Sequence, residues 1–191
     1  MDSVYCYPNT DILINDLNIR SKEKLHEVER KITTLRIQDL LENPLKGKFD
    51  FRHLKKIHAY IFQDVYAWAG KIRMVDIVKS NMFCKAEFIS GQADEIFLRL
   101  KEDNYLKGLG GKKLVVKMAY YFSEINALHP FRDGNGRAQR EFIRELALYN
   151  GYILRLADIS EDVMLEASKE SFLCDYGKME DIFEKGLHIN L

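Results

Sequence analysis

The sequence predicts an all-α protein with one short β-hairpin. Apolar residues recur every three or four positions along most of the chain, which is the spacing of amphipathic helices. Only residues 72–84 combine β-branched residues with a central turn, as a hairpin does. The chain has 191 residues, of which 47% are hydrophobic, so we expect one domain, 1–191, with a sizeable core.

The first part of the chain is expected to form an arm and two helices. Residues 1–20 contain Pro8 and several turn formers, which indicates an irregular arm packed on the domain. Ser21 is a suitable N-cap for a helix over residues 21–41, and a second helix is expected over 51–63. The residues expected to face the core from these helices are Leu25, Val28, Ile32, Leu35, Leu54, Ile57 and Ile61.

The hairpin is expected where β-branched residues interleave between residues 72 and 78. Lys79-Ser80-Asn81 would form the turn, and the return strand would begin at Met82. A two-stranded hairpin is marginal by itself, so it should lie against the helices. On pattern alone, it is a plain surface hairpin.

The rest of the chain is predicted to be helical. A helix over 86–103 is followed by a glycine-rich stretch, 106–113, and by a helix over 114–128. The glycine-rich stretch lacks the first glycine and the Ser or Thr of a phosphate-binding P-loop, so we interpret it as a connection. The helix that follows the glycines at 134 and 136 is expected to end at Asn150-Gly151. A further helix is expected from a cap at Asp158 or Ser160 to about Ser171, and a last one over 178–185.

Charge and composition exclude several classes of protein. Lysine plus arginine (29) equals aspartate plus glutamate (29), so no global field would direct the chain to nucleic acid or to a membrane. Neither a leader-like start nor an apolar run of membrane-spanning length is found, and we expect a cytoplasmic protein. Cys6, Cys84 and Cys174 lack the spacing of a zinc site or a disulfide framework.

One polar stretch, residues 129–140 with the sequence HPFRDGNGRAQR, joins two of the predicted helices. Pro130 ends the first helix, and Gly134-Asn135-Gly136 can adopt backbone conformations that let amide groups converge on one point. A glycine turn that leads into a helix N-terminus is a ready-made anion site. Any one of these residues alone would indicate an ordinary polar connection, and it is their combination that favours a functional site.

The side chains of this stretch fit phosphate chemistry. Arg137 and Arg140 are three positions apart in the first turns of a helix, and so lie on one side of it. Asp133 offers a hard oxygen ligand for Mg²⁺ beside the phosphate site. His129 can accept a proton near neutral pH. A base, a metal ligand, an anion nest and two arginines together predict a site for phosphoryl or nucleotidyl transfer.

The stretch resembles the Fic motif, H-P-F-x-D/E-G-N-G-R-x-x-R, and every fixed position is filled. The flanking segments 62–73, FQDVYAWAGKIR, and 124–128, EINAL, also resemble that family, and the likeness covers roughly Tyr5 to Leu187. It implies a Fic fold and the transfer of AMP from ATP to a Ser, Thr or Tyr hydroxyl of another protein. Doc-type phosphotransferases have Lys where Gly136 stands, so Gly136 favours AMP transfer.

The resemblance also implies a role for each motif residue. His129 would be the general base that takes the proton of the attacking hydroxyl. Mg²⁺ on Asp133 would bridge the α- and β-phosphates of ATP and neutralise charge on the leaving group. The remaining phosphate ligands implied are Gly134, Asn135 and Gly136 through their amides, and Arg137 and Arg140 through their side chains.

In Fic proteins, the hairpin at 72–84 is called the flap, and it holds the target segment by main-chain pairing beside ATP. The physical reason is that an edge strand offers unpaired N–H and C=O groups to a peptide of any sequence. The candidate docking residues are Ile77, Val78, Lys79 and Ser80.

Many Fic proteins carry an inhibitory helix, [S/T]-x-x-x-E-[G/N], whose glutamate pairs with the second motif arginine, here Arg140. No Ser or Thr of this chain has Glu four positions later. The chain most resembles the branch that works as a toxin with a small antitoxin, so we expect an antitoxin to carry this helix; a helix following Leu191 is the other possibility. The resemblance makes type II topoisomerase subunits the first candidate targets. The alternatives are a Fic-fold phosphotransferase and a catalytically silent binding module.

Overall fold

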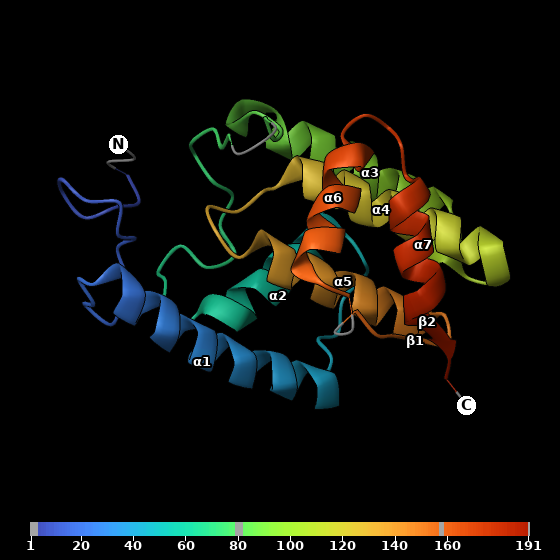
Figure 1. The fold of residues 1–191 in the computed structure, drawn as a ribbon, viewed down its shortest axis with the longest axis horizontal. Coiled ribbons are helices and arrows are strands. Elements are labelled where there is room, and N and C mark those ends of the chain that lie inside the picture. Colours follow the sequence, from blue (N-terminus) through green and yellow to red (C-terminus); the bar gives the residue numbers. More distant parts are fainter. Residues whose placement is uncertain (1–3, 79–81, 157–158, 191) are drawn as a thin grey trace.

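The structure is a computed structural model that describes residues 4–78, 82–156 and 159–190 (Figure 1). Within these ranges it has seven α-helices, two 3₁₀ turns and one two-stranded antiparallel sheet, which confirms the predicted fold class. The elements are α1 (Lys22–Glu42), α2 (Phe51–Phe62), η1 (Ala86–Phe88), α3 (Ile89–Glu102), η2 (Asn104–Leu106), α4 (Gly111–Leu128), α5 (Asn135–Tyr149), β1 (Tyr152–Leu154), α6 (Glu161–Ser171), α7 (Gly177–Gly186) and β2 (Leu187–Ile189).

Helices α4 and α5 form the centre of the domain, and the other helices pack around them. α2 packs against α5, whereas α3 and α7 pack against α4. α6 lies beside α7, and α1 runs along the edge of the domain against α2 (Figure 1). The loop between α4 and α5 therefore lies at the junction of the two central helices. No helix in the described ranges combines the length and the apolar character needed to cross a membrane.

Side-chain caps fix where several helices begin. The Ser21 hydroxyl accepts a hydrogen bond from the Lys24 amide at 3.3 Å, as predicted for the start of α1. Ser160 caps α6 in the same way through the Val163 amide. The alternative cap, Asp158, lies outside the described residues.

The core confirms most of the predicted inward faces. The predicted residues of the helix at 51–63 are buried, and so is the apolar face of α3: these are Leu54, Ile57, Ile61, Ile89, Ala93, Ile96, Phe97 and Leu100. The prediction for α1 was wrong at Leu35, which is 66% exposed. The buried face of α1 instead carries Glu29 and Thr33 between Leu25 and Leu40, because this face meets a charged side chain of α5.

The predicted hairpin forms one antiparallel bridge, between Val78 and Met82, and the Phe83 amide donates to the Ile77 carbonyl at 3.3 Å. The predicted turn, Lys79-Ser80-Asn81, lies outside the described residues. The segment 72–84 therefore folds back on itself as expected, although its described residues contain no regular strand.

The regular strands, which the sequence analysis did not predict, are β1 and β2. Tyr152 pairs with Ile189, and Leu154 pairs with Leu187. Each strand has three residues and directly follows a helix or its terminal turn, so neither shows an alternating pattern long enough to recognise. The N-terminal arm is irregular as predicted, with one bridge between Cys6 and Leu13 and with Leu13 buried.

Candidate active site

The motif residues 129–140 form the loop from the end of α4 into the first turns of α5. His129 is the C-cap of α4 and adopts a left-handed conformation, with φ 45° and ψ 58°. Gly134, the N-cap of α5, has φ 75°. A Cβ atom on Gly134 would lie 2.2 Å from Cζ of Phe62, so only glycine fits at this position. Both ends of the loop thus need conformations that most side chains avoid.

Side chains hold the loop in this shape. The Asn135 amide group bonds both backbone groups of Phe131: Nδ2 donates to the carbonyl at 2.7 Å, and Oδ1 accepts from the amide at 2.8 Å. Nε2 of His58 lies 2.9 Å from the carbonyl oxygen of Asp133, and the Gly70 amide donates to Nδ1 of His58 at 2.8 Å. Because Nδ1 accepts, Nε2 carries the hydrogen and donates to Asp133.

His58 is a neutral structural residue in this environment. Its ring is stacked between those of Phe131, with centroids 3.8 Å apart, and Phe62, with centroids 4.6 Å apart. Burial lowers the pKa of His58 to about 4, although the hydrogen bond to the Asp133 carbonyl raises it in part. His58 therefore anchors the backbone of the loop, and His129 stays the predicted general base.

His129 lies against the flap. Its ring stacks on that of Phe83, with centroids 3.7 Å apart and planes 16° apart. The next residue of the flap, Cys84, donates its amide hydrogen to the carbonyl of Ala127, in the last turn of α4, at 3.0 Å. The structure thus places the ring of His129 against the second arm of the segment 72–84.

The start of α5 carries the backbone amides that were predicted to bind an anion. Asn135 and Gly136 are the first two residues of the helix, where backbone amides have no carbonyl acceptor within the helix. The Gly134 amide donates to Oδ1 of Asp133 at 2.5 Å, so this amide faces the acid. Asp133 is exposed beside these amides. Amides and carboxylate lie together, as the sequence predicted.

The two motif arginines have different surroundings. Nη1 of Arg137 lies 2.7 Å from Oε1 of Glu29 and 3.2 Å from Oγ1 of Thr33, and its guanidinium lies 4.5 Å from the ring centroid of Phe62. The other oxygen of Glu29 accepts a hydrogen bond from the Tyr66 hydroxyl. Burial, and then this contact with Glu29, raise the pKa of Tyr66, which stays protonated and keeps donating.

Arg140, by contrast, is exposed and lies over Gly136. A Cβ atom on Gly136 would lie 3.2 Å from Nη1 of Arg140. No carboxylate in the described ranges forms an ion pair with Arg140, whereas Arg137 and Arg144 each have an acidic partner. The Arg140 guanidinium is thus the motif cation whose charge remains available to an anion at the start of α5.

This geometry agrees with the sequence comparison, in which residues 48–147 match the Fic/DOC family. The chain belongs to the Fic/DOC family. The probable protein adenylyltransferase Fic of Escherichia coli K12 is 37% identical over 182 residues, which cover 95% of this chain and 90% of that protein. Protein adenylyltransferase VbhT of Bartonella schoenbuchensis is 39% identical over 184 residues. These cover 96% of this chain but 38% of VbhT.

Solved structures show the same Fic fold. The N-terminal Fic domain of a Bep effector protein of Bartonella quintana, with bound ADP, superposes with a TM-score of 0.93 and 29% identity, covering 97% of this chain and 94% of that one. The BepC protein of Bartonella tribocorum, with bound AMPPNP, gives a TM-score of 0.92 and 26% identity, covering 97% and 96% of the two chains.

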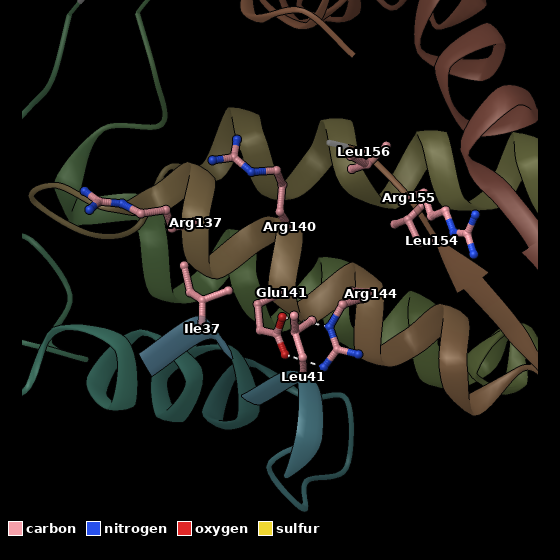
Figure 2. Close-up of a pocket in the computed structure, with 9 residues that line it drawn as sticks. All are labelled: Ile37, Leu41, Arg137, Arg140, Glu141, Arg144, Leu154, Arg155 and Leu156. Carbon is pink, nitrogen blue, oxygen red and sulfur yellow. Dashed lines mark hydrogen bonds and ion pairs between the residues drawn. The ribbon is translucent and has the colours of Figure 1, made fainter. Parts of the chain in front are cut away.

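A pocket of about 470 Å³ opens next to the two arginines of the Fic motif (Figure 2). Ile37 and Leu41 of α1 face α5 across it, and β1 and the residues after it close one end. Neither His129 nor Asp133 lines this space, so it lies on the arginine side of the motif. Its lining residues are Ile37, Leu41, Arg137, Arg140, Glu141, Arg144, Leu154, Arg155 and Leu156.

The residues that support the Fic motif were not predicted as site residues. His58 and Glu29 both lie on helices, where a polar residue at a position that faces the core was the available signal. Glu29 follows Leu25 by four positions and precedes Thr33 by four, so all three share one face of α1. The prediction from apolar residues alone placed Leu35 on the buried face of α1 instead.

Proposed function

We propose that this chain is an ATP-dependent protein adenylyltransferase, which transfers AMP to a Ser, Thr or Tyr hydroxyl of a target protein. The observation that carries the proposal is the complete Fic motif in one loop, with His129 against the flap and with Arg140, which has no ion pair among the described residues, at the start of α5. The names of the relatives support it, since the Fic protein that matches over 90% of its length is named a probable protein adenylyltransferase.

The reaction follows from these positions. The hydroxyl oxygen of the target attacks the α-phosphorus of ATP, and His129 accepts the hydroxyl proton as the new P–O bond forms. The bond from the α-phosphorus to the oxygen bridging it to the β-phosphate breaks, and pyrophosphate leaves with that electron pair. The amides of Asn135 and Gly136 and the guanidinium of Arg140 stabilise the phosphate charge.

A magnesium ion fits this site. Mg²⁺ commonly takes one or two protein carboxylates and completes its shell with phosphate oxygens and water. Asp133 supplies one exposed carboxylate beside the phosphate site, and no cluster of three metal-binding side chains occurs in the described ranges. When bound, the ion would neutralise charge on the phosphates, while Asp133 holds it at the loop.

The flap is proposed to dock the target by main-chain pairing. Ile77 and Val78 precede the turn, and Val78 is 63% exposed. Because the Phe83 amide already bonds the Ile77 carbonyl, a target strand would add along the outer edge of the flap. Lys79 and Ser80 remain predicted docking residues.

Labelled ATP tests the proposed chemistry. Wild-type protein incubated with a bacterial lysate and ATP labelled at the α-phosphate should label a protein band, whereas ATP labelled at the γ-phosphate should not. His129→Ala should lose the signal. Transfer of the γ-label would support the phosphotransferase alternative, and transfer of neither label would support a silent binding module. Gly136 favours the first outcome, since it leaves the amides at the start of α5 accessible.

We also propose that a separate antitoxin inhibits the chain through an S/T-x-x-x-E-G/N helix. The pocket between α1 and α5 suits such a helix, because Ile37 and Leu41 offer apolar contacts and Arg140 can pair with its glutamate. A peptide of the form Ser-x-x-x-Glu-Gly should inhibit α-label transfer, and the same peptide with Gly in place of Glu should not. Equal inhibition by both peptides would reject this pairing. Type II topoisomerase subunits are the first targets to test.

A further inference from the structure

The flanking segment 62–73 ends in an arginine to which the proposed chemistry gives no role. The side chain of Arg73 is fully buried, with 0% exposure, and it is the largest side chain among those buried to this degree. A charged group is seldom buried so completely unless polar partners surround it. The partners of Arg73 are backbone carbonyls.

Three carbonyl oxygens surround the guanidinium group of Arg73. Nε donates to the carbonyl of His129 at 2.8 Å, and Nη1 donates to that of Val75 at 2.6 Å. Nη2 donates to the carbonyl of Cys84. In addition, the backbone amide of Arg73 donates to the carbonyl of Pro130 at 2.9 Å. These acceptors belong to the Fic loop and to both arms of the flap.

The His129 carbonyl is the contact that links Arg73 to catalysis. His129 is the C-cap of α4, and the last carbonyl groups of a helix have no amide within the helix to donate to them. A positive φ is uncommon for any residue other than glycine, although histidine adopts it more often than most. A donor held on its carbonyl oxygen stabilises that conformation, which in turn directs the imidazole toward Phe83.

Arg73 is not placed to bind phosphate. Its guanidinium is enclosed by backbone, and the nearest acidic partner is Asp76, whose Oδ1 lies 3.9 Å from Nη1. That same oxygen accepts a hydrogen bond from the Ala86 amide at 2.7 Å, so Asp76 ties the first arm of the flap to the end of the second. Burial lowers the pKa of Arg73, yet an arginine stays charged in a folded protein.

We propose that Arg73 is a positioning residue that holds the flap and His129 in one fixed relation. The proposal rests on the proposed adenylyl transfer, in which the flap holds the acceptor segment and His129 takes its proton. A planar guanidinium meets three carbonyls in fixed directions, whereas a lysine ammonium cannot reproduce this fork. Loss of Arg73 should therefore disturb the position of the target hydroxyl relative to His129, and should leave nucleotide binding intact.

The test compares Arg73→Lys with Arg36→Lys. Arg36 of α1 also joins two segments, through hydrogen bonds of 2.7 and 2.9 Å to Asp64 in the turn after α2, but these bonds involve neither flap nor motif. Each protein is measured in three ways: hydrogen exchange of peptides from 72–78 and 82–86, affinity for AMPPNP with Mg²⁺, and α-label transfer in a bacterial lysate. Temperatures are set at a fixed interval below each melting temperature, so that global stability does not enter.

For Arg73→Lys we expect flap exchange about tenfold faster or more, AMPPNP affinity within about twofold of wild type, and transfer at least about tenfold slower. Arg36→Lys should change none of these. Unchanged flap exchange, or AMPPNP affinity that falls in parallel with transfer, would overturn the proposal.

Two further points keep the test decisive. If Arg73→Lys does not fold, Asp76→Ala replaces it, since Asp76 is 55% exposed and its loss should loosen the same two arms. It should raise flap exchange and lower transfer in the same pattern, and wild-type values for both would count against the proposal. If wild-type protein transfers no α-label, the proposed function fails, and the exchange and AMPPNP measurements still decide what Arg73 holds.

Discussion

Glu29→Gln isolates the charge that holds the first motif arginine. In the wild type, one oxygen of Glu29 meets Arg137 and the other accepts from the Tyr66 hydroxyl. Glutamine can place its oxygen toward Arg137 and donate from its NH₂ group to the Tyr66 hydroxyl, but it is neutral, so the hydrogen bond between Arg137 and a charged acceptor is lost. Such a bond contributes about 1.5–3 kcal/mol. The Glu29 side chain is 9% exposed and that of Arg137 is 25% exposed, so water can replace little of the lost hydrogen-bond energy.

We therefore expect Glu29→Gln to lower the free energy of unfolding by about 2 kcal/mol. For a domain of this size, that corresponds to a fall of about 4–8 °C in melting temperature. Thermal unfolding followed by circular dichroism at pH 7.5 measures it. Glu27→Gln is the matched control: Glu27 is two positions away, its side chain is 57% exposed and it pairs with Lys31 across one helical turn. An exposed pair of this kind contributes little.

A double-mutant cycle assigns the effect to the pair. Combining Glu29→Gln with Arg137→Gln should give less destabilisation than the sum of the single changes, with a coupling of about 1 kcal/mol or more. Melting temperatures of Glu29→Gln and Glu27→Gln within about 1 °C of each other would refute the reasoning. Additive effects in the cycle would refute it as well, because the two side chains would then not depend on each other.

Three further predictions follow from the site. His129→Ala should slow α-label transfer by about 10²–10⁴-fold while AMPPNP affinity, measured by calorimetry, stays near wild type; transfer within about tenfold would reject the base. Gly136→Lys should abolish AMP transfer by placing a bulky cation over the amides, and unchanged α-labelling would exclude the nest. The folded pKa of His58, about 4, lies below its unfolded value of 6.5, so the unfolded state binds more protons between them. Stability in EDTA should thus fall by up to about 3 kcal/mol as pH drops from 6.5 toward 4, and His58→Gln should remove most of that slope in urea unfolding.

Local patterns were enough to predict the helices and the Fic motif. The caps at Ser21 and Ser160 and the inward face of α2 depend on residues within one or two turns of each other. The motif is contiguous, and its residues converge because a loop and a helix start bring neighbours in sequence together in space. His129, Asp133 and the two arginines could therefore be named as candidate site residues without knowing the fold.

The supporting residues could not be predicted, because their partners are distant in sequence. Arg73 bonds a carbonyl 56 positions away, and His58 bonds one 75 positions away. Glu29 forms its ion pair only when α1 packs beside Arg137. This packing buries the face of α1 that carries Glu29 and leaves Leu35 exposed. The pairing of β1 with β2 likewise joins segments separated by two helices. No local periodicity encodes such contacts.

The contacts between α1 and α5 have a consequence for synthesis on the ribosome. The bond from Arg137 to Thr33 spans 104 residues, and so does that from Arg144 to the Leu40 carbonyl. Helix α1 can form early, but its buried face has no partner until α5 has left the ribosome. At about 5–20 residues per second, this interval lasts about 5–20 s. During this interval, Glu29 of the nascent chain is exposed to solvent, and the phosphate site is not yet assembled.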